Sequence, residues 1–206
     1  MRRTKEAAQR TRRRVLRAAR EVFARQGVAR TSLEQVARAA GVTRGAVYWH
    51  FRNKADLFYR MREEISLPLL DRIDLALAPA AAGDPLVGIE SMLRALLDEV
   101  EGNRATRTVF SIVNFRCEYV DEFRRELRRQ ARRTARFVEL LARGYRRAAR
   151  TGVLRPGLAP ETAALETCAF TIGLLRLRLM GAGVRASSTH LRELAAQHVS
   201  GLRRSS

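Results

Sequence analysis

The chain has 206 residues, which allows one hydrophobic core of good size or two small ones. Its formal net charge of +19 favours nucleic acid or an anionic membrane surface as a partner, and residues 1–60 hold 16 of the 40 basic residues but 4 of the 21 acidic ones, so the charge is densest there. No apolar run reaches the length of a membrane-spanning helix, and the cysteines and histidines do not cluster, so we expect no metal site and no cofactor.

The first helical pattern follows a basic N-terminal segment. This segment has no apolar stretch like that of a signal peptide, so we expect a cytoplasmic protein without a disulfide. The helix ends at Gln26-Gly27. Its apolar residues recur at helical spacing and are Val15, Ala18, Ala19, Val22 and Phe23.

Two short helical patterns flank a glycine in the stretch TSLEQVARAAGVTRGAVYWHFRNKAD, residues 31–56. Ser32 and Gln35 have the spacing of a capping box at the start of the first helix. Gly41 stands where a left-handed residue is expected to end that helix, and Thr43 precedes the second helix as its cap. Two helices joined by such a short glycine-containing turn form a helix-turn-helix.

The second of these helices, over 44–51, is unusual for a purely structural element. Val47 and Phe51 form an inward face at i and i+4, which leaves Tyr48 and Trp49 pointing elsewhere. Two exposed aromatic side chains on so short a helix indicate a partner that covers them. Core packing is the alternative interpretation for both aromatic residues.

Helical patterns continue to the end of the chain without a strand signal. Asn53 caps a helix that runs to about Ala78 with Pro68 inside it, and small residues at 78–85 form a loop. Further helices are expected from Pro85 to the break at Gly102-Asn103 and over 106–113, 121–151, 165–181 and 189–202, with a loop between Pro156 and Pro160. The predicted fold class is all-α, with about nine helices.

The segment AGVTRGAVYWHFRNKADLF resembles the DNA-binding signature of TetR-family transcription regulators. Together with CEYVDEF at 117–123, it looks most like the AcrR/TtgR group, which represses multidrug efflux operons. The resemblance implies an N-terminal three-helix helix-turn-helix DNA-binding domain over 1–55 and a C-terminal helical ligand-binding and dimerisation domain over 56–206. The residues at the family's spacing are Gly41, Gly45, Tyr48, His50, Phe51 and Lys54.

By the family's pattern, the helix at 44–51 enters the major groove of double-stranded DNA. Arg44 is expected to bind a guanine through two hydrogen bonds, and Ser32 and Lys54 are expected to hold phosphates that fix the register. A capping role is the alternative for His50. The full set of expected DNA contacts is Ser32, Thr43, Arg44, Gly45, Tyr48, Trp49, His50 and Lys54.

The resemblance also implies that the last two helices pair between subunits in a homodimer, which would bind a pseudo-palindromic operator. The expected interface residues are Leu165, Phe170, Leu174, Leu177, Leu191, Leu194 and Val199. Arg176 and Arg178 interrupt this apolar pattern and narrow the face.

A small apolar or aromatic inducer is expected in the C-terminal domain, because ligand sites are usually apolar cavities with a few polar groups. The candidate lining residues are Leu67, Leu70, Met92, Leu96, Arg107, Phe110, Ser111, Asn114, Phe115, Cys117, Phe137, Leu141, Cys168 and Thr171. Ordinary core packing is the alternative for each aliphatic residue.

Taken together, the sequence predicts a ligand-responsive transcriptional repressor that controls a multidrug efflux operon. One alternative is a TetR-like regulator of lipid or secondary metabolism. Another is a non-specific architectural DNA-binding protein, for which the net charge alone is the argument. No catalytic arrangement of Ser/His/Asp or Cys/His, no carboxylate pair and no phosphate loop is evident, so we expect no enzyme. We also expect no membrane partner.

Overall fold

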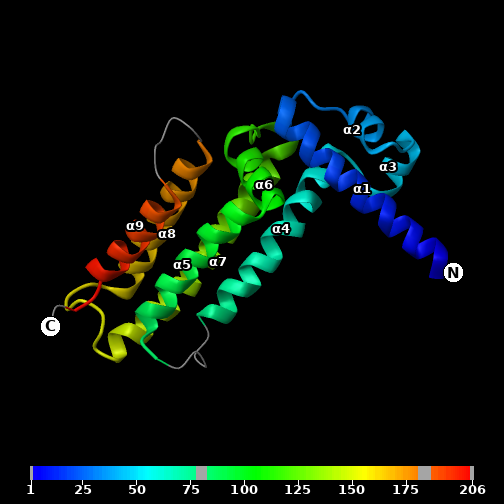
Figure 1. The fold of residues 1–206 in the computed structure, drawn as a ribbon. Coiled ribbons are helices and arrows are strands. Elements are labelled where there is room, and N and C mark those ends of the chain that lie inside the picture. The colour runs from blue at the N-terminus through cyan, green and yellow to red at the C-terminus, as the bar shows by residue number, and fades with distance from the viewer. Residues whose placement is uncertain (1, 78–82, 181–186, 205–206) are drawn as a thin grey trace. The chain divides into compact units, whose positions relative to one another are not determined.

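The computed structural model describes residues 2–77, 83–180 and 187–204. These residues form nine α helices and one short 3-10 helix, η1, and they contain no strand (Figure 1). The elements are α1 (Arg2–Gln26), α2 (Leu33–Ala40), α3 (Arg44–His50), α4 (Lys54–Ala76), α5 (Pro85–Gly102), α6 (Arg104–Phe115), η1 (Asp121–Phe123), α7 (Arg124–Arg150), α8 (Pro160–Leu179) and α9 (Ser188–Gly201). The all-α prediction is confirmed.

Most predicted helix ends lie within a few residues of the observed ones, and the starts of α1 and α8 are the exceptions. α1 begins at Arg2, so the basic segment that was expected to precede the first helix is part of it. α8 begins at Pro160, five residues before the predicted start. The loop predicted between Pro156 and Pro160 therefore ends where the helix begins, because proline has the backbone angle of a first helical residue and needs no amide hydrogen there. The predicted ends at Ala78 and Gly181, and most of the predicted 78–85 loop, lie outside the described residues.

The helices group into two compact units. The first contains the residues up to Leu67 together with Arg104–Arg128, and the second contains Pro68–Asn103 together with the residues from Arg129 onward. The division falls within α4 and within α7. It differs from the predicted boundary after residue 55, because the start of α4 and the whole of α6 pack into the first unit.

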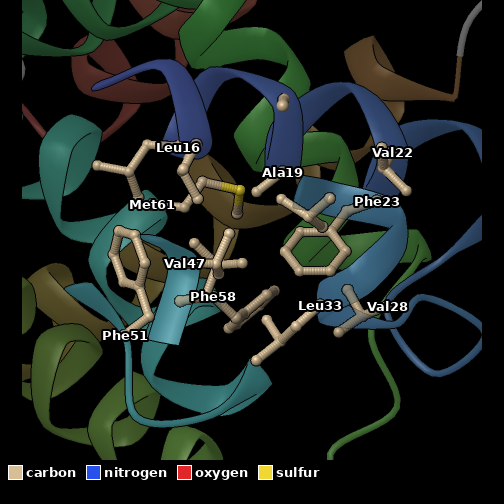
Figure 2. Close-up of a cluster of buried hydrophobic side chains, with 14 of the residues drawn as sticks. Leu16, Ala19, Val22, Phe23, Val28, Leu33, Val47, Phe51, Phe58 and Met61 are labelled. Atoms are coloured by element: carbon tan, nitrogen blue, oxygen red, sulfur yellow. The ribbon is translucent and has the colours of Figure 1, made fainter. Parts of the chain in front are cut away.

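The core of the first unit explains this grouping (Figure 2). The apolar stripe predicted for α1 is buried, and Phe23 packs edge-on against Phe58 of α4 with ring centroids 6.1 Å apart. Phe58 in turn meets Phe123 at 5.5 Å. Val109 and Ile112 of α6 join the same cluster. Burial of this apolar surface fixes α1 to α2, α3 and α6 in one unit.

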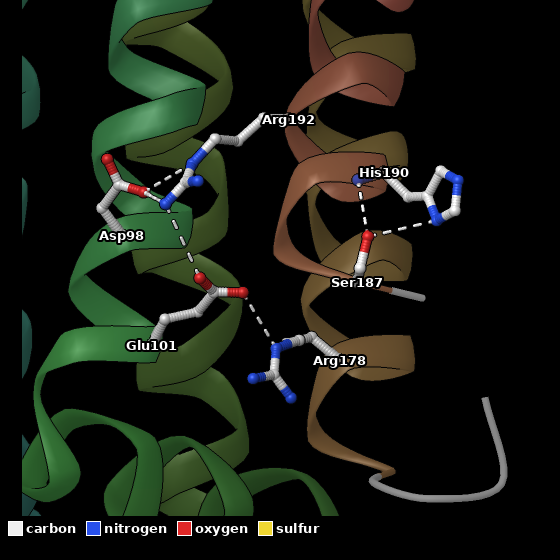
Figure 3. Close-up of polar contacts among 6 residues, drawn as sticks. All are labelled: Asp98, Glu101, Arg178, Ser187, His190 and Arg192. Atoms are coloured by element: carbon white, nitrogen blue, oxygen red, sulfur yellow. Dashed lines mark hydrogen bonds and ion pairs between the residues drawn. The ribbon is translucent and has the colours of Figure 1, made fainter. Parts of the chain in front are cut away.

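The second unit is built around α5, whose apolar side chains recur at helical spacing and are buried. Asp84 caps this helix by accepting a hydrogen bond from the Leu86 amide at 2.9 Å. Figure 3 shows three ion pairs that link α5 to its neighbours: Arg178 of α8 lies 3.0 Å from Glu101, and Arg192 of α9 lies 2.6 Å from Asp98 and 3.8 Å from Glu101. Arg178, which interrupts the apolar pattern of α8, therefore has a partner within its own unit.

A polar chain crosses the interior of the second unit. The Tyr145 hydroxyl of α7 lies 2.6 Å from the Thr167 hydroxyl of α8, which lies 2.8 Å from Nε2 of His198 on α9. The His198 ring stacks on Phe170 with centroids 4.2 Å apart. Burial raises the pKa of Tyr145 to about 12. Three helices are thus joined by hydrogen bonds that satisfy buried polar groups.

Candidate nucleic-acid interface

The turn between α2 and α3 has the predicted geometry. Ser32 Oγ accepts from the Gln35 amide at 3.3 Å, and Gln35 Oε1 accepts from the Ser32 amide at 2.8 Å, which completes a capping box. Gly41 has a left-handed φ of 62° and ends α2. Thr43 Oγ1 then accepts from the Ala46 amide at 3.2 Å and caps α3. Local hydrogen bonds therefore fix both helices.

One residue of α1 that the sequence reasoning missed also fixes this turn. Arg14 Nη2 donates to the carbonyl of Ala40 at 2.8 Å and to that of Gly41 at 3.0 Å. These are carbonyls that the end of α2 leaves without helical partners, and a cation is favourable at a helix C-terminus. An arginine on the preceding helix gives no periodic signal, so this contact was not visible in the sequence.

The faces of α3 divide as predicted. Val47 and the following Phe51 are buried in the core of the first unit. Tyr48 is 44% exposed and Trp49 is 73% exposed, so core packing does not account for either aromatic ring. The indole of Trp49 meets the His50 ring edge-on, with centroids 4.5 Å apart. Burial and the charge of Arg12 lower the pKa of His50, which favours its neutral form.

Arg44, the first residue of α3, is held on two sides. Its Nε lies 2.9 Å from Glu34 Oε1 of α2. Its guanidinium carbon lies 5.2 Å from the centroid of the Tyr48 ring, and Nη2 is 3.5 Å from the Tyr48 hydroxyl. The hydrogen bond to Tyr48 and the charge of Glu34 raise the pKa of Arg44. The sequence reasoning named Arg44 and Tyr48 but missed Glu34.

Lys54, at the start of α4, is engaged within the first unit. Its Nζ donates to the carbonyl of Ala29 at 3.0 Å and lies 3.6 Å from Glu122 Oε1. The ammonium also lies 5.8 Å from the Phe123 ring centroid. Asn53 caps α4 by accepting from the Asp56 amide at 2.8 Å. A phosphate contact by Lys54 remains a prediction. It requires the ammonium to bind the phosphate in addition to the Ala29 carbonyl and the Glu122 carboxylate.

The residues predicted to line an inducer site fall in both units. In the second unit the structure buries Met92, Leu96, Leu141, Cys168 and Thr171, and it half-buries Leu70 and Phe137. In the first unit it leaves Leu67, Arg107 and Phe115 exposed and half-buries Phe110, Ser111, Asn114 and Cys117. Asn114 donates to the Phe110 carbonyl of its own helix at 2.8 Å, so its amide is already partnered.

The structure brings two of these predicted residues together at a cavity. Met92, Ala95 and Leu96 of α5 line it together with Leu69, Arg72 and Ile73 of α4. Its volume is about 50 Å³. Sites for drug-sized ligands span roughly 300 to 1,000 Å³. A larger inducer would therefore need these side chains to move.

The predicted dimer residues are of two kinds. Leu174, Leu191 and Val199 are buried inside the second unit, because α8 and α9 pack on their own chain through these side chains. Leu165, Leu177 and Leu194 are exposed, and Phe170 is half-buried against His198. Ile172 of α8 and Met180, which directly follows α8, are also exposed and were not among the predicted residues. The apolar surface of α8 open to a partner thus differs in part from the predicted one.

Among the described residues, no group of three or more His, Cys, Asp or Glu side chains is placed to hold a metal ion. Cys117 and Cys168 are both free thiols. No helix in the described ranges is both long enough and apolar enough to cross a membrane.

Residues 15–61 match the family described as "Bacterial regulatory proteins, tetR family". The chain is 35% identical over 183 residues to the HTH-type transcriptional regulator TtgR of Pseudomonas putida, covering 87% of this chain and 85% of TtgR. It is 34% identical to NalD, described as the secondary repressor of the MexAB-OprM multidrug efflux pump in Pseudomonas aeruginosa, with a TM-score of 0.87 over 98% of this chain and 100% of NalD.

A third similar structure is a complex of SmeT with triclosan. It is 27% identical to this chain, with a TM-score of 0.83 over 95% of this chain and 92% of SmeT. SmeT is described as the repressor of the Stenotrophomonas maltophilia multidrug efflux pump SmeDEF. The similarity to these proteins extends over both compact units and beyond the helix-turn-helix.

Proposed function

This chain belongs to the tetR family of bacterial regulatory proteins, and on that premise we propose that it is a homodimeric repressor of a multidrug efflux operon that a small ligand releases from DNA. One observation carries the DNA-binding part of the proposal. The helix α3 is capped and anchored by its ends, yet it leaves Arg44, Tyr48 and Trp49 exposed on its outer side. A helix of this kind fits the major groove.

In this proposal Arg44 reads a guanine and the neighbouring residues fix the helix on the duplex. Thr43 and Tyr48 contact phosphate or a thymine methyl, and Gly45 lets the helix approach closely because it has no side chain. Outside the neighbouring residues and the helix's own backbone, the Thr43 hydroxyl, at 4.0 Å, is the only described atom within 4 Å of the position where a side chain on Gly45 would begin. Phosphate contacts of this kind supply affinity, and the base contact supplies preference.

The remaining contacts proposed for this interface go to the DNA backbone. Trp49 and His50 hydrogen-bond phosphates, and the helix starts at Ser32 and Lys54 hold the phosphates that set the register. All these residues lie in the first unit, on or beside α2, α3 and the start of α4, and this supports a common interface.

A homodimer would place two such interfaces on one operator. The exposed apolar side chains of α8 and α9 support this part, since Leu165 is 62% exposed and Leu194 is 42% exposed in the single chain. A two-fold dimer binds a pseudo-palindrome because each half-site meets the same surface.

Control of efflux is supported by the descriptions of the similar proteins NalD and SmeT as repressors of multidrug efflux pumps. The SmeT–triclosan complex supports a small aromatic compound as the class of inducer. Such a compound acts only if it binds the released state more tightly than the DNA-bound state, and this difference limits the release.

The test is binding to the DNA that flanks the chain's own gene, compared with a scrambled duplex at near-physiological salt. The measurement is repeated with dyes, antibiotics and bile-salt-like compounds. A large preference for the native duplex that one compound abolishes is the expected result. Equal affinity for both duplexes, with a steep salt dependence, would instead indicate an architectural protein.

The base-reading role is tested by Arg44→Ala on the preferred duplex. We expect loss of base preference at one position in each half-site, with discrimination there reduced by about 1–3 kcal/mol. The measurement is competition binding against duplexes changed one base pair at a time. A variant that weakened binding to every sequence equally would show that Arg44 contacts phosphate only.

A further inference from the structure

Arg44 receives a carboxylate from α2 that the proposed DNA contacts do not use. Glu34 lies in the first turn of α2, and it is the only acidic residue between Val28 and Asn53. Its Oε1 lies 2.9 Å from Nε of Arg44, and both side chains are open to solvent. An acidic group is costly on a surface that binds phosphates, so its presence beside the base-reading arginine requires an explanation.

The geometry of the contact supplies that explanation. An arginine has five N–H donors, one on Nε and four on the two terminal nitrogens. Glu34 forms an ion pair with Nε at 2.9 Å, and Nη2 lies 3.5 Å from the Tyr48 hydroxyl, which leaves N–H groups on both terminal nitrogens for O6 and N7 of guanine. The Tyr48 ring lies beside the guanidinium at 5.2 Å and limits its movement on a second side.

We propose that Glu34 is a positioning residue that holds Arg44 in the orientation for reading guanine. This inference rests on the proposed function, because it assumes that α3 enters the major groove. A free arginine side chain loses rotamer freedom when it binds a base, and a side chain already held loses less. Glu34 therefore favours the duplex with guanine at the contacted position.

The same carboxylate lowers the affinity for DNA as a whole. Where no guanine faces Arg44, the negative charge of Glu34 still repels the phosphates and no base contact compensates for it. Backbone contacts dominate non-specific binding, so this repulsion weakens binding to every sequence. Specificity is a difference between two affinities, so a repulsion common to every sequence leaves it unchanged, and Glu34 raises specificity only through its hold on Arg44.

The test compares Glu34→Gln with Glu21→Gln. Both substitutions remove one negative charge from the first unit, but Glu21 lies on α1 at an exposed position and does not contact Arg44. Full-length protein is bound to a pool of duplexes with a randomised segment, and the bound fraction is sequenced. We expect Glu34→Gln to reduce the guanine preference at one position per half-site about two- to fivefold, the range for an exposed ion pair.

Glu21→Gln should leave the guanine preference at its wild-type value. Thermal unfolding of both variants checks that the fold is intact. Stronger binding of Glu34→Gln to the whole pool, with the same guanine preference as Glu21→Gln, would overturn the inference, since it would reduce Glu34 to a general repulsive charge.

A second arm combines Glu34→Gln with Arg44→Ala. If Glu34 acts through Arg44, the added substitution leaves the base preference of Arg44→Ala unchanged. A further loss of preference in the double variant would overturn the inference, because Glu34 would then act on DNA by another route. Failure of the proposed function gives a different result, in which the wild-type protein itself selects no sequence from the pool.

Discussion

The helices α3 and α8 are held in place in different ways. α3 has seven residues, one of them fully buried, and it is fixed by the Thr43 cap before it and by the buried Phe51 after it. α8 has 20 residues and no side-chain cap at Ala159, but it buries seven side chains along its length. A helix held at its ends can present most of its surface to a partner, whereas a helix held by one face offers only the opposite face.

The largest effect is expected when the anchor at the end of α3 is removed. Phe51→Ala should lower the free energy of unfolding by about 3–5 kcal/mol, because it empties a fully buried ring site. Chemical denaturation measures this change. The matched control is Phe115→Ala, which removes a ring that is 37% exposed and should cost well under half as much. Equal losses would mean that Phe51 is no special anchor for α3.

The next largest effect is expected on dimerisation, from a substitution on the exposed face of α8. Leu165→Glu should raise the dissociation constant of the homodimer roughly 30-fold, since a central apolar contact is commonly worth about 2 kcal/mol. Analytical ultracentrifugation measures this constant. Val87→Glu places the same charge at another exposed apolar site in the second unit and should leave the dimer intact. A Leu165→Glu variant that dimerises normally would move the interface away from this face.

Removing the cap of α3 and adding a cap to α8 should change the stability of the protein in opposite directions. Thr43→Ala removes the side chain that caps α3 and should cost about 1 kcal/mol of stability. Ala159→Ser adds a cap to α8, where the backbone already has the extended conformation of a capping residue, and should gain up to about 1 kcal/mol. Denaturation midpoints of the two variants give both values. If Ala159→Ser gained nothing, the Pro160 start would already supply what a cap provides.

The smallest expected effect is a pH dependence of stability that arises in the second unit. Burial lowers the pKa of His198 below its usual 6.5, so the unfolded chain takes up the proton first as the pH falls. The free energy of unfolding is therefore highest above about pH 6.5 and falls as the pH is lowered below this value. The measurement is the denaturation midpoint between about pH 7.5 and about pH 5.5.

His198→Gln should show a flatter pH profile than the wild type. The pKa of His50 in the first unit is also lowered by burial, so part of the slope should remain in this variant. Adding His50→Gln should remove more of the slope. Identical slopes for the wild type and His198→Gln would show that the ring is as accessible to protons in the folded chain as in the unfolded one.

The helix-turn-helix could be predicted almost residue by residue, because its determinants are local. Ser32, Gln35 and Gly41 act on atoms a few residues away, and a spacing in the sequence is enough to identify such contacts. The inward position of Val47 followed from helical spacing for the same reason.

What the sequence did not reveal depends on which helices meet. A helix over 106–113 was predicted, but Val109 and Ile112 carry no sign in the sequence that they pack into the first unit. In the same way, Leu174 and Leu165 are alike in sequence, yet one is buried in its own chain and the other is exposed. The contacts of Arg14 and Glu34 join different helices and were missed because no spacing rule connects them.

The place of α6 in the core of the first unit has a consequence for exchanging parts between regulators. The module that carries α3 is discontinuous along the chain, since its interior is completed by Val109, Ile112 and Phe123, which lie far beyond Met61 in the sequence. A chimaera joined after residue 55 or after residue 67 would graft α3 without these three side chains. Recombination that preserves the fold must carry the 104–128 segment with the N-terminal helices, so exchanging this unit between regulators needs two separate segments, whereas a point change in α3 needs neither.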